Sequence, residues 1–325
     1  MSAGVFRCLL LGVLLACGCV GGRRDRDPPP VCVRPLPAHL QHTAPDALPA
    51  VVWYELLFKG YRDGISADLV DCSGEPIAWA PLPSSCVEGE PESTVRQRRR
   101  ALRADELIIR HAGGEYWFGW APFLAFDNGM SEGPLAIARV HAGKLEVRAL
   151  GTLRAYSKRV RLEIRKLGQA HILVAEGEWC GASASPRSPL EQPSASTCAR
   201  GTRLLWLDRQ RFRERPLRSL TVRSCLGPAW FPQTDVRATQ LNTRWSRTLQ
   251  RDLALAYEDE LITVDEHITV SDLDVSSPSL PARRFREAQA RIRVSLEAGE
   301  LLSEGQSLWN AIRTEDGATG QASPP

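Results

Sequence analysis

The sequence predicts a mostly β fold of antiparallel sheets, arranged as a sandwich or an open barrel, with few short helices. Two observations predict it. Apolar and charged residues alternate along several segments, and glycine-containing turns separate those segments. Alternation places one face of a strand in a core and the other in water, as in antiparallel sheets. With 325 residues, 43% hydrophobic and 24% charged, the chain is long enough for roughly two domains.

The alternating segments run from the middle of the chain almost to its end. The clearest ones cover residues 144–149, 160–165, 261–270 and 291–296. Glycine supplies the positive φ that tight hairpins require, and it occurs in turns at residues 111–114, 141–143 and 297–299. Helical patterning is sparse. Residues 92–105 predict one surface helix, and residues 239–255 predict either a second helix or a long strand.

Composition divides the chain into a tether, a body and a tail. Scattered prolines over residues 17–50 favour extended backbone and predict a semi-stiff tether. We expect a β-rich domain over residues 51–230 and a second β-rich segment over residues 231–313, either sharing one core or having two. Residues 314–325 have almost no large apolar side chain, which predicts a disordered tail.

The first residues have the composition of an export signal. Arg7 precedes an apolar run from Cys8 to Ala16, and small residues close that run. The run is far shorter than the roughly 20 residues of a membrane-spanning helix. Residues 1–16 are therefore predicted to be a signal peptide, and the mature chain is predicted to be exported.

The residues Leu14-Leu15-Ala16-Cys17 resemble the lipobox of bacterial lipoproteins. This resemblance implies that Cys17 becomes the lipidated first residue of the mature protein, and a second frame places the lipid on Cys19. Two or three acyl chains, as in that class, anchor a protein stably. The residue after the lipidated cysteine is not aspartate in either frame, so the resemblance implies the outer membrane of the cell envelope. Ordinary signal-peptide cleavage near Gly18, leaving a soluble secreted protein, is the alternative.

Cysteines predict disulfide bonds in the exported chain. Without Cys8, eight cysteines remain; lipidation of Cys17 leaves 8 − 1 = 7, an odd number, whereas processing at Cys19 leaves six. A Ser/Pro-rich stretch separates Cys180 from Cys198, and a turn-rich stretch separates Cys72 from Cys86. Because a bridge lowers the entropy of a long unfolded loop, we expect the pairs Cys180–Cys198 and Cys72–Cys86.

Two groups of polar residues are candidate sites. Asp265 and His267 lie two residues apart on one strand face, where they could bind a metal ion or pair as base and orienter. An ordinary solvated sheet face would show the same pattern. The second group is a charge run that could contact anionic lipid headgroups or an acidic partner, or could simply be solvated. Its members are Arg96, Arg98, Arg99, Arg100 and Arg103.

The remaining signals favour binding over catalysis. The motifs G-x-S-x-G, G-x-x-x-x-G-K-[ST], H-E-x-x-H and G-x-G-x-x-G do not occur, so no catalytic residue and no cofactor are assigned. Trp117 and Trp120 lie in a strand that is apolar on both faces, which favours a core position over sugar stacking. A net charge of only +3 argues against nucleic acid as a partner.

These features predict a membrane-anchored exported lipoprotein with a non-catalytic β-rich domain. We expect that domain to bind an unknown protein or glycan of the cell envelope. The alternative is a secreted or anchored protein that binds or degrades polysaccharide, using tryptophans and paired acids from separate strands.

Overall fold

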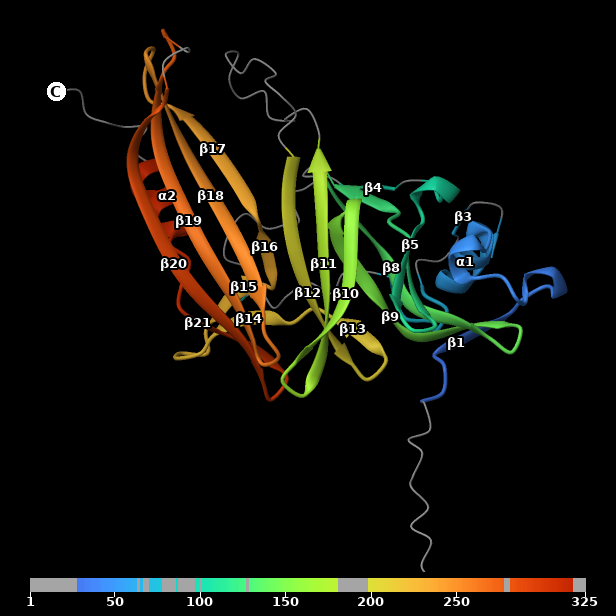
Figure 1. Ribbon diagram of the computed structural model, residues 1–325. Coiled ribbons are helices and arrows are strands. Elements are labelled where there is room, and N and C mark those ends of the chain that lie inside the picture. Colours follow the sequence, from blue (N-terminus) through green and yellow to red (C-terminus); the bar gives the residue numbers. More distant parts are fainter. Residues whose placement is uncertain are drawn as a thin grey trace, which may run out of the picture.

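The computed structural model confirms a mostly β protein with few short helices (Figure 1). It describes residues 28–62, 65–66, 70–77, 86, 97–99, 101–126, 129–180, 198–277 and 281–317. Among these residues, the α-helices are α1 (Ala50–Leu57) and α2 (Trp309–Gly317), and the 3₁₀ helices are η1 (Ala38–Leu40), η2 (Pro45–Ala47) and η5 (Ala104–Glu106).

The described strands form a twelve-stranded sheet, a seven-stranded sheet and a short hairpin. The first sheet holds β1 (Cys32–Pro35), β4 (Gln97–Arg99), β5 (Ile108–Gly113), β6 (Tyr116–Trp120), β7 (Leu124–Phe126), β8 (Met130–His141), β9 (Lys144–Tyr156), β10 (Lys158–Leu167), β11 (Ala170–Cys180), β12 (Cys198–Asp208), β13 (Arg211–Arg213) and β16 (Trp230–Pro232). The second holds β14 (Pro216–Ser219), β15 (Cys225–Pro228), β17 (Thr234–Gln240), β18 (Trp245–Tyr257), β19 (Leu261–Asp274), β20 (Arg283–Glu297) and β21 (Glu300–Glu304). The hairpin pairs β2 (Tyr61–Arg62) with β3 (Ile65–Ser66).

The first sheet curls into a near-barrel. Its strand order is β10-β11-β12-β13-β9-β8-β6-β5, and the two ends of this order approach each other, with Arg110 Nε of β5 3.4 Å from the Val160 carbonyl oxygen of β10. A buried apolar cluster fills the interior and includes Phe118, Trp120, Leu135 and Leu205. The core position expected for Trp120 is therefore confirmed, and Trp117 packs on the opposite side of β6 against a second cluster.

Two glycines allow strands of this sheet to pass very close to other backbone. A Cβ atom at Gly133 would lie 1.8 Å from the carbonyl oxygen of Ala121, and one at Gly177 would lie 2.1 Å from that of Tyr156. No side chain fits in such a space, so the curl of the sheet depends on glycine at both positions.

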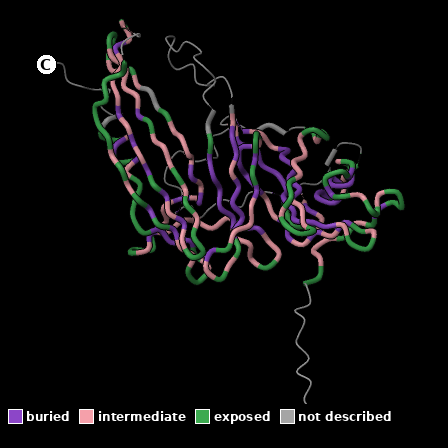
Figure 2. Tube along the Cα trace, in the orientation of Figure 1, coloured by how far each residue is buried: buried purple, intermediate pink, exposed green. Residues whose placement is uncertain are grey.

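The second sheet packs one face on the first sheet and on α2. Its strand order is β15-β14-β21-β20-β19-β18-β17, antiparallel except where β14 pairs with β21. Burial alternates residue by residue along the first part of β19, as predicted, and the buried residues include Ile262 and Val264. These residues share one cluster with Val174, Leu204 and Phe231 of the first sheet. Figure 2 shows buried positions inside the first sheet and around α1 as well as between the two sheets.

The expected division of the chain at residue 230 does not coincide with the division between the sheets. β14 and β15 precede residue 231 but belong to the second sheet, while β16 is the last strand of the first. Because the shared cluster contains residues from both sides of the expected boundary, the two segments have a common core.

The predicted proline-rich tether is too long at its carboxyl end. β1 pairs with the edge of β9, and Leu36 and Leu48 are buried in one cluster with Trp53 of α1. An edge strand tolerates Pro35, and the apolar residues between the prolines supply enough surface to pack. Residues 17–27 of the predicted tether, and all of the predicted signal peptide, lie outside the described residues.

Three other local predictions, for residues 92–105, 239–255 and 314–325, are right only in part or wrong. The helix predicted over residues 92–105 is wrong in its described part, where Gln97–Arg99 form β4 and pair with β7. Residues 239–255 are extended rather than helical, but they do not form one long strand: a turn at residues 241–244 separates β17 from β18. In the tail, residues 314–317 continue α2, and residues 318–325 lie outside the described part.

Two disulfides join residues that the sequence interpretation did not pair. Cys32 bonds to Cys72 and Cys86 bonds to Cys225, so the predicted Cys72–Cys86 bridge is wrong. The local loop argument failed because strand pairing brings distant cysteines closer: β1 lies beside the turn at Cys72, and β15 presents Cys225 from the second sheet.

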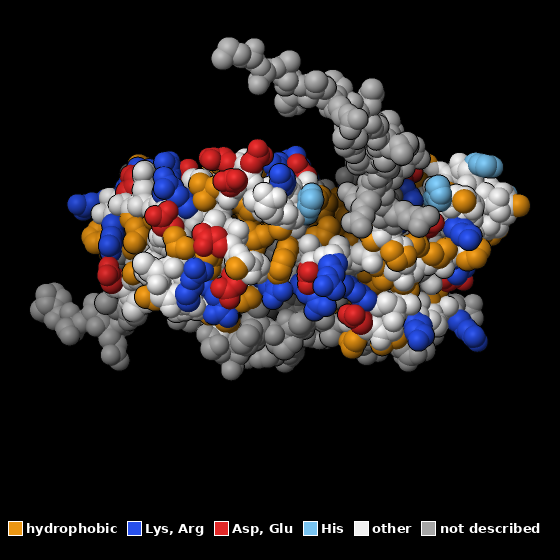
Figure 3. Space-filling model, turned by 90° about the horizontal axis from the view of Figure 1, so that it is seen from below, with side chains coloured by type: hydrophobic (Ala, Val, Ile, Leu, Met, Phe, Trp, Pro, Cys, Tyr) orange, Lys and Arg blue, Asp and Glu red, His pale blue; other side chains and the backbone are white. Residues whose placement is uncertain are grey.

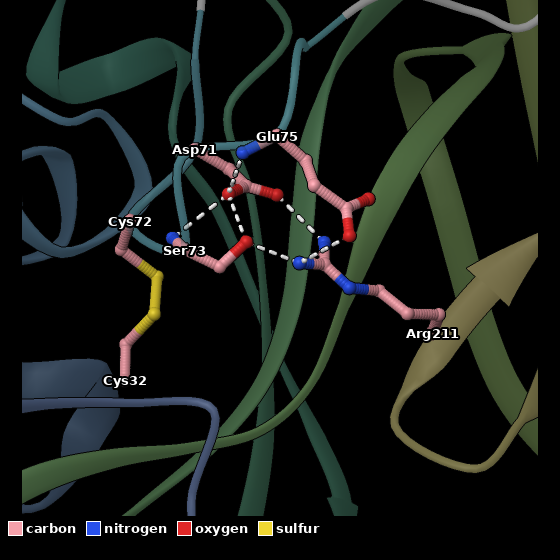
Figure 4. The surroundings of a disulfide bond; sticks show 6 residues. All are labelled: Cys32, Asp71, Cys72, Ser73, Glu75 and Arg211. Atoms are coloured by element: carbon pink, nitrogen blue, oxygen red, sulfur yellow. Dashed lines mark hydrogen bonds and ion pairs between the residues drawn. A yellow bond between two sulfur atoms is a disulfide. The ribbon is translucent and has the colours of Figure 1, made fainter.

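An ion pair holds the turn that follows Cys72 (Figure 4). Oδ1 of Asp71 accepts hydrogen bonds from the backbone N–H groups of Ser73 and Glu75, at 2.8 and 3.1 Å, and from the Ser73 hydroxyl. Oδ2 accepts from Nη1 of Arg211 at 2.7 Å, and the same guanidinium contacts Ser73 and Glu75. The buried Asp71 carboxylate thus ties this turn to β13.

We predict that Cys180 and Cys198 form a third disulfide. The two residues face each other directly in the β11–β12 register, although their side chains lie outside the described part. Such a bridge would close a loop of 17 residues and stabilise the fold by about 3 kcal/mol in the chain-entropy model. Non-reducing peptide mapping should recover the two residues in one linked peptide; alkylation of Cys180 in unreduced protein would contradict the prediction.

Candidate functional site

The outward face of the second sheet is polar across three neighbouring strands. Strand alternation and register place side chains in rows, with Asp252, His267 and Gln289 in one row. The next row along the same face contains Ala254, Asp265 and Arg291. The expectation that Asp265 and His267 share one polar strand face is thus consistent with the register of β19.

Between these rows lies a shallow hollow of about 620 Å³. The residues of the intervening row turn their side chains toward the other face, which leaves a groove across the strands. The lining residues include no tryptophan; they are Asp252, Leu253, Ala254, Asp265, Glu266, His267, Gln289, Ala290 and Arg291.

Asp265 and His267 each interact with β20 rather than with each other. Oδ1 of Asp265 lies 2.6 Å from Nε of Arg291, and Nε2 of His267 lies 2.6 Å from Oε1 of Glu287. Glu287 also contacts Arg284. Within the described ranges, no group of three or more His, Cys, Asp or Glu side chains could hold a metal ion. The site therefore presents one ion pair, Asp265–Arg291, and one hydrogen-bonded pair, His267–Glu287, an arrangement suited to recognition by hydrogen bonds and charge.

A buried carboxylate supports the floor of the hollow from behind. Glu266 points to the inner face, where Oε1 accepts from the Ser307 hydroxyl at 2.6 Å and Oε2 from the backbone N–H of Leu308 at 2.7 Å. Nη1 of Arg251 lies 3.9 Å from the same Oε1 atom of Glu266. Sequence reasoning missed this residue, although an acid at an inward position of an alternating strand is a signal of a buried polar partner.

The aspartates near the end of β19 have structural roles. Asp272 accepts two hydrogen bonds from Arg247, at 2.8 and 3.0 Å. Asp274 accepts from Ser276 and Arg244, and these bonds, that of the Ser276 hydroxyl above all, hold the pKa of Asp274 below its ordinary value. Both residues fix the end of the sheet and lie apart from the lining of the hollow.

The predicted arginine run falls only partly within the described residues. Arg98 and Arg99 belong to β4, Arg103 is exposed and lies 3.4 Å from Asp105, and Arg96 and Arg100 lie outside the described part. Contact of this run with an anionic surface stays a prediction.

Replacing His267 with alanine is expected to raise the pKa of Glu287. That pKa lies below the ordinary glutamate value, chiefly because His267 donates a hydrogen bond to the carboxylate, with Arg284 as the next cause. A carboxyl group with a lowered pKa stabilises the fold above its unfolded-state pKa, and the contribution is lost as the pH falls through the folded-state pKa. The variant should therefore lose less stability on acidification.

Carboxyl carbon NMR titration of Glu287 measures this shift directly. His171→Ala, at an exposed histidine of β11, is the matched control and should leave the Glu287 midpoint unchanged. An unaltered midpoint in His267→Ala would show that the hydrogen bond does not set the pKa.

No known protein family, curated protein or solved structure matches this chain. Neither described helix is both long enough and apolar enough to cross a membrane. The two disulfides indicate an oxidising, exported environment, because such bonds are rare in the reducing cytosol.

Proposed function

We propose that this protein is an exported lipoprotein of the cell envelope, anchored at the outer membrane through Cys17, or through Cys19 in the second frame. In this proposal its β body binds an envelope protein or glycan and performs no catalysis. The observation that carries the binding role is the outward polar face of the second sheet, where a hollow of about 620 Å³ is surrounded by charged side chains that already have partners.

The chemistry of this face supports recognition more than catalysis. A general base needs a carboxylate or imidazole free to take a proton, and a metal site needs convergent ligands. Asp265 is engaged by Arg291 in an ion pair and His267 by Glu287 in a hydrogen bond, so neither side chain is free. A partner with complementary charges could exchange these hydrogen bonds for its own.

Hydrogen bonds to residues 28–31, where the N-terminal segment joins the β body, support the proposed lipid anchor. Arg148 Nη1 donates to the carbonyl oxygen of Pro28 at 2.6 Å, Gln210 Nε2 to that of Pro29 at 2.6 Å, and the Val31 N–H to Val147 at 2.8 Å. The body thus holds its own N-terminal segment firmly, starting eleven residues after Cys17. A lipid at Cys17 would tether a rigid body by a short segment.

Mass spectrometry of the mature amino terminus tests the anchor. We expect a diacylated or triacylated Cys17 in protein from the membrane fraction, and loss of membrane retention in Cys17→Ser. A lipid on Cys19 would correct the frame and keep the class. An unmodified terminus near Gly18 in the wild-type protein would refute the anchor.

Photo-crosslinking in intact cells tests the binding face. A photoreactive residue at exposed Gln289, beside the hollow, should give a discrete adduct that weakens when Arg291→Glu reverses the neighbouring charge. The same residue at exposed Ala298, in a turn at the end of β20, serves as the control position. Equal adducts from both positions would contradict recognition by this face.

A further inference from the structure

Three turns form the end of the first sheet at which the chain joins the body. They are the β8–β9 turn (residues 141–144), the β10–β11 turn (166–171) and the β12–β13 turn (208–211), which lie at the lower side of Figure 1. We call these residues the lower rim. The N-terminal segment touches two of the turns, since Gln210 donates to Pro29 and the Leu36 N–H donates to Gly143 at 2.9 Å.

The lower rim is basic. Its cations are Lys144, Lys166, Arg209 and Arg211, against the single acid Asp208. Arg211 is paired with Asp71, whereas Lys144, Lys166 and Arg209 are exposed. Seen from below in Figure 3, Lys and Arg side chains gather near the middle of this face. Three exposed cations therefore lie around the place from which the N-terminal segment leaves.

The neighbouring turns of the second sheet have the opposite charge. Glu258, Asp259 and Glu260 form the β18–β19 turn, and the Gly168 N–H of the lower rim donates to the Asp259 carbonyl oxygen at 2.8 Å. At physiological salt, exposed charges interact over about 10 Å or less, so the charges of each turn interact mainly with the part of a surface nearest to that turn. An anionic surface would attract the rim and repel this acidic turn, and because the two turns are in contact, the acids oppose the attraction of Lys166, the rim cation on the β10–β11 turn.

The N-terminal segment limits how far the rim can lie from an anchor. Cys17 and Pro28 are 28 − 17 = 11 residues apart, which spans at most roughly 40 Å even when fully extended. A lipid chain together with a basic patch is a recognised combination for stable attachment to anionic membranes.

We propose that the lower rim, through Lys144, Lys166 and Arg209, docks on the anionic phospholipid headgroups of the bilayer that holds the lipid anchor. The inference rests on the proposed anchor for its choice of occupant. In this orientation the lower end of the first sheet contacts the bilayer, and the polar face with its hollow stays open to the envelope space.

The test uses the purified full-length lipidated chain in vesicles of phosphatidylcholine with or without phosphatidylglycerol. A diazirine amino acid is placed at Gln169 in the rim or at Thr243 in the β17–β18 turn, which lies at the opposite end of the second sheet; both positions are exposed. We expect lipid adducts from Gln169 to exceed those from Thr243 at least fivefold, and only when phosphatidylglycerol is present.

A second experiment removes the positive charges of the lower rim. Lys144→Gln, Lys166→Gln and Arg209→Gln together should reduce the Gln169 adduct, because each basic group near an anionic surface contributes about fivefold to binding. Arg283→Gln, Arg284→Gln and Arg286→Gln remove the same charge from exposed positions of β20 and should leave the adduct unchanged. Circular dichroism confirms that both variants are folded.

Equal adducts from Gln169 and Thr243, or equal losses in the two charge variants, would overturn the docking while leaving the anchor intact. An adduct to protein instead of lipid at Gln169 would overturn it as well. If mass spectrometry finds no lipid on the mature chain, the proposed anchor fails. Flotation of that unlipidated chain with the same vesicles then tests the docking of the lower rim by itself. Binding to vesicles without phosphatidylglycerol, or no binding to either kind of vesicle, would refute that docking.

Discussion

Replacing Cys86 and Cys225 together with serine is expected to lower the free energy of unfolding by about 5 kcal/mol, the largest effect of any change considered. The bond spans 139 residues and joins the segment before β4 to β15 of the second sheet. Because a cross-link reduces the entropy of the unfolded chain more when it closes a longer loop, its removal favours the unfolded state strongly. Urea unfolding of oxidised protein measures the loss.

The second disulfide provides the matched control. Cys32 and Cys72 are 40 residues apart, so the corresponding double serine variant should lose about 4 kcal/mol. Double replacement in each case avoids a lone thiol that could exchange with other cysteines. A Cys86/Cys225 variant that unfolds at the wild-type urea midpoint would contradict the assignment of this bond.

Arg203→Met is expected to destabilise the protein by about 3–5 kcal/mol. The Arg203 side chain is fully buried, its Nη1 lies 2.5 Å from Oε1 of the nearly buried Glu214, and its guanidinium stacks 5.0 Å from the Trp230 ring centroid. Methionine fills a similar volume, so the main loss is the partner of a carboxylate that water barely reaches. Denaturant unfolding, followed by tryptophan fluorescence, measures the change.

A double-mutant cycle separates this effect from simple loss of packing. Arg203→Met with Glu214→Gln should be less destabilised than Arg203→Met alone, because the second change removes the buried negative charge. Arg284→Met, which breaks the exposed contact with Glu287, should change stability by about 1 kcal/mol or less. Additive losses in the double variant would show that the two charges do not stabilise each other.

At the candidate site, the residue pattern predicts which face of a strand a side chain lies on, but not its partners. Alternation along β19 predicts that Asp265 and His267 share an outward face, because a strand turns successive side chains to opposite sides. It does not identify Arg291 and Glu287 as their partners. Those residues come from β20, and a shift of one residue in the pairing of β19 with β20 would have placed different side chains beside them.

The cysteines show the same limit more sharply. Loop composition favours bonds between cysteines that are near in sequence, such as Cys72 and Cys86, because the argument considers only the residues between them. The bonds formed depend instead on β1 lying at the edge of β9 and on β15 lying in the second sheet. Both placements are long-range events that composition does not encode.

For residues 239–255 the residue pattern left a helix and a long strand open, but it predicted the mostly β class, the outward position of Asp265 and His267, and the core position of Trp120. These follow from side-chain period and turn residues, which act over a few neighbours. The curl of the first sheet into a near-barrel, the pairing of β1 with β9 and the pairing of the cysteines became known only from the folded structure. Each of these depends on packing between segments far apart in the chain, where register and buried apolar surface, rather than local propensity, decide the energy.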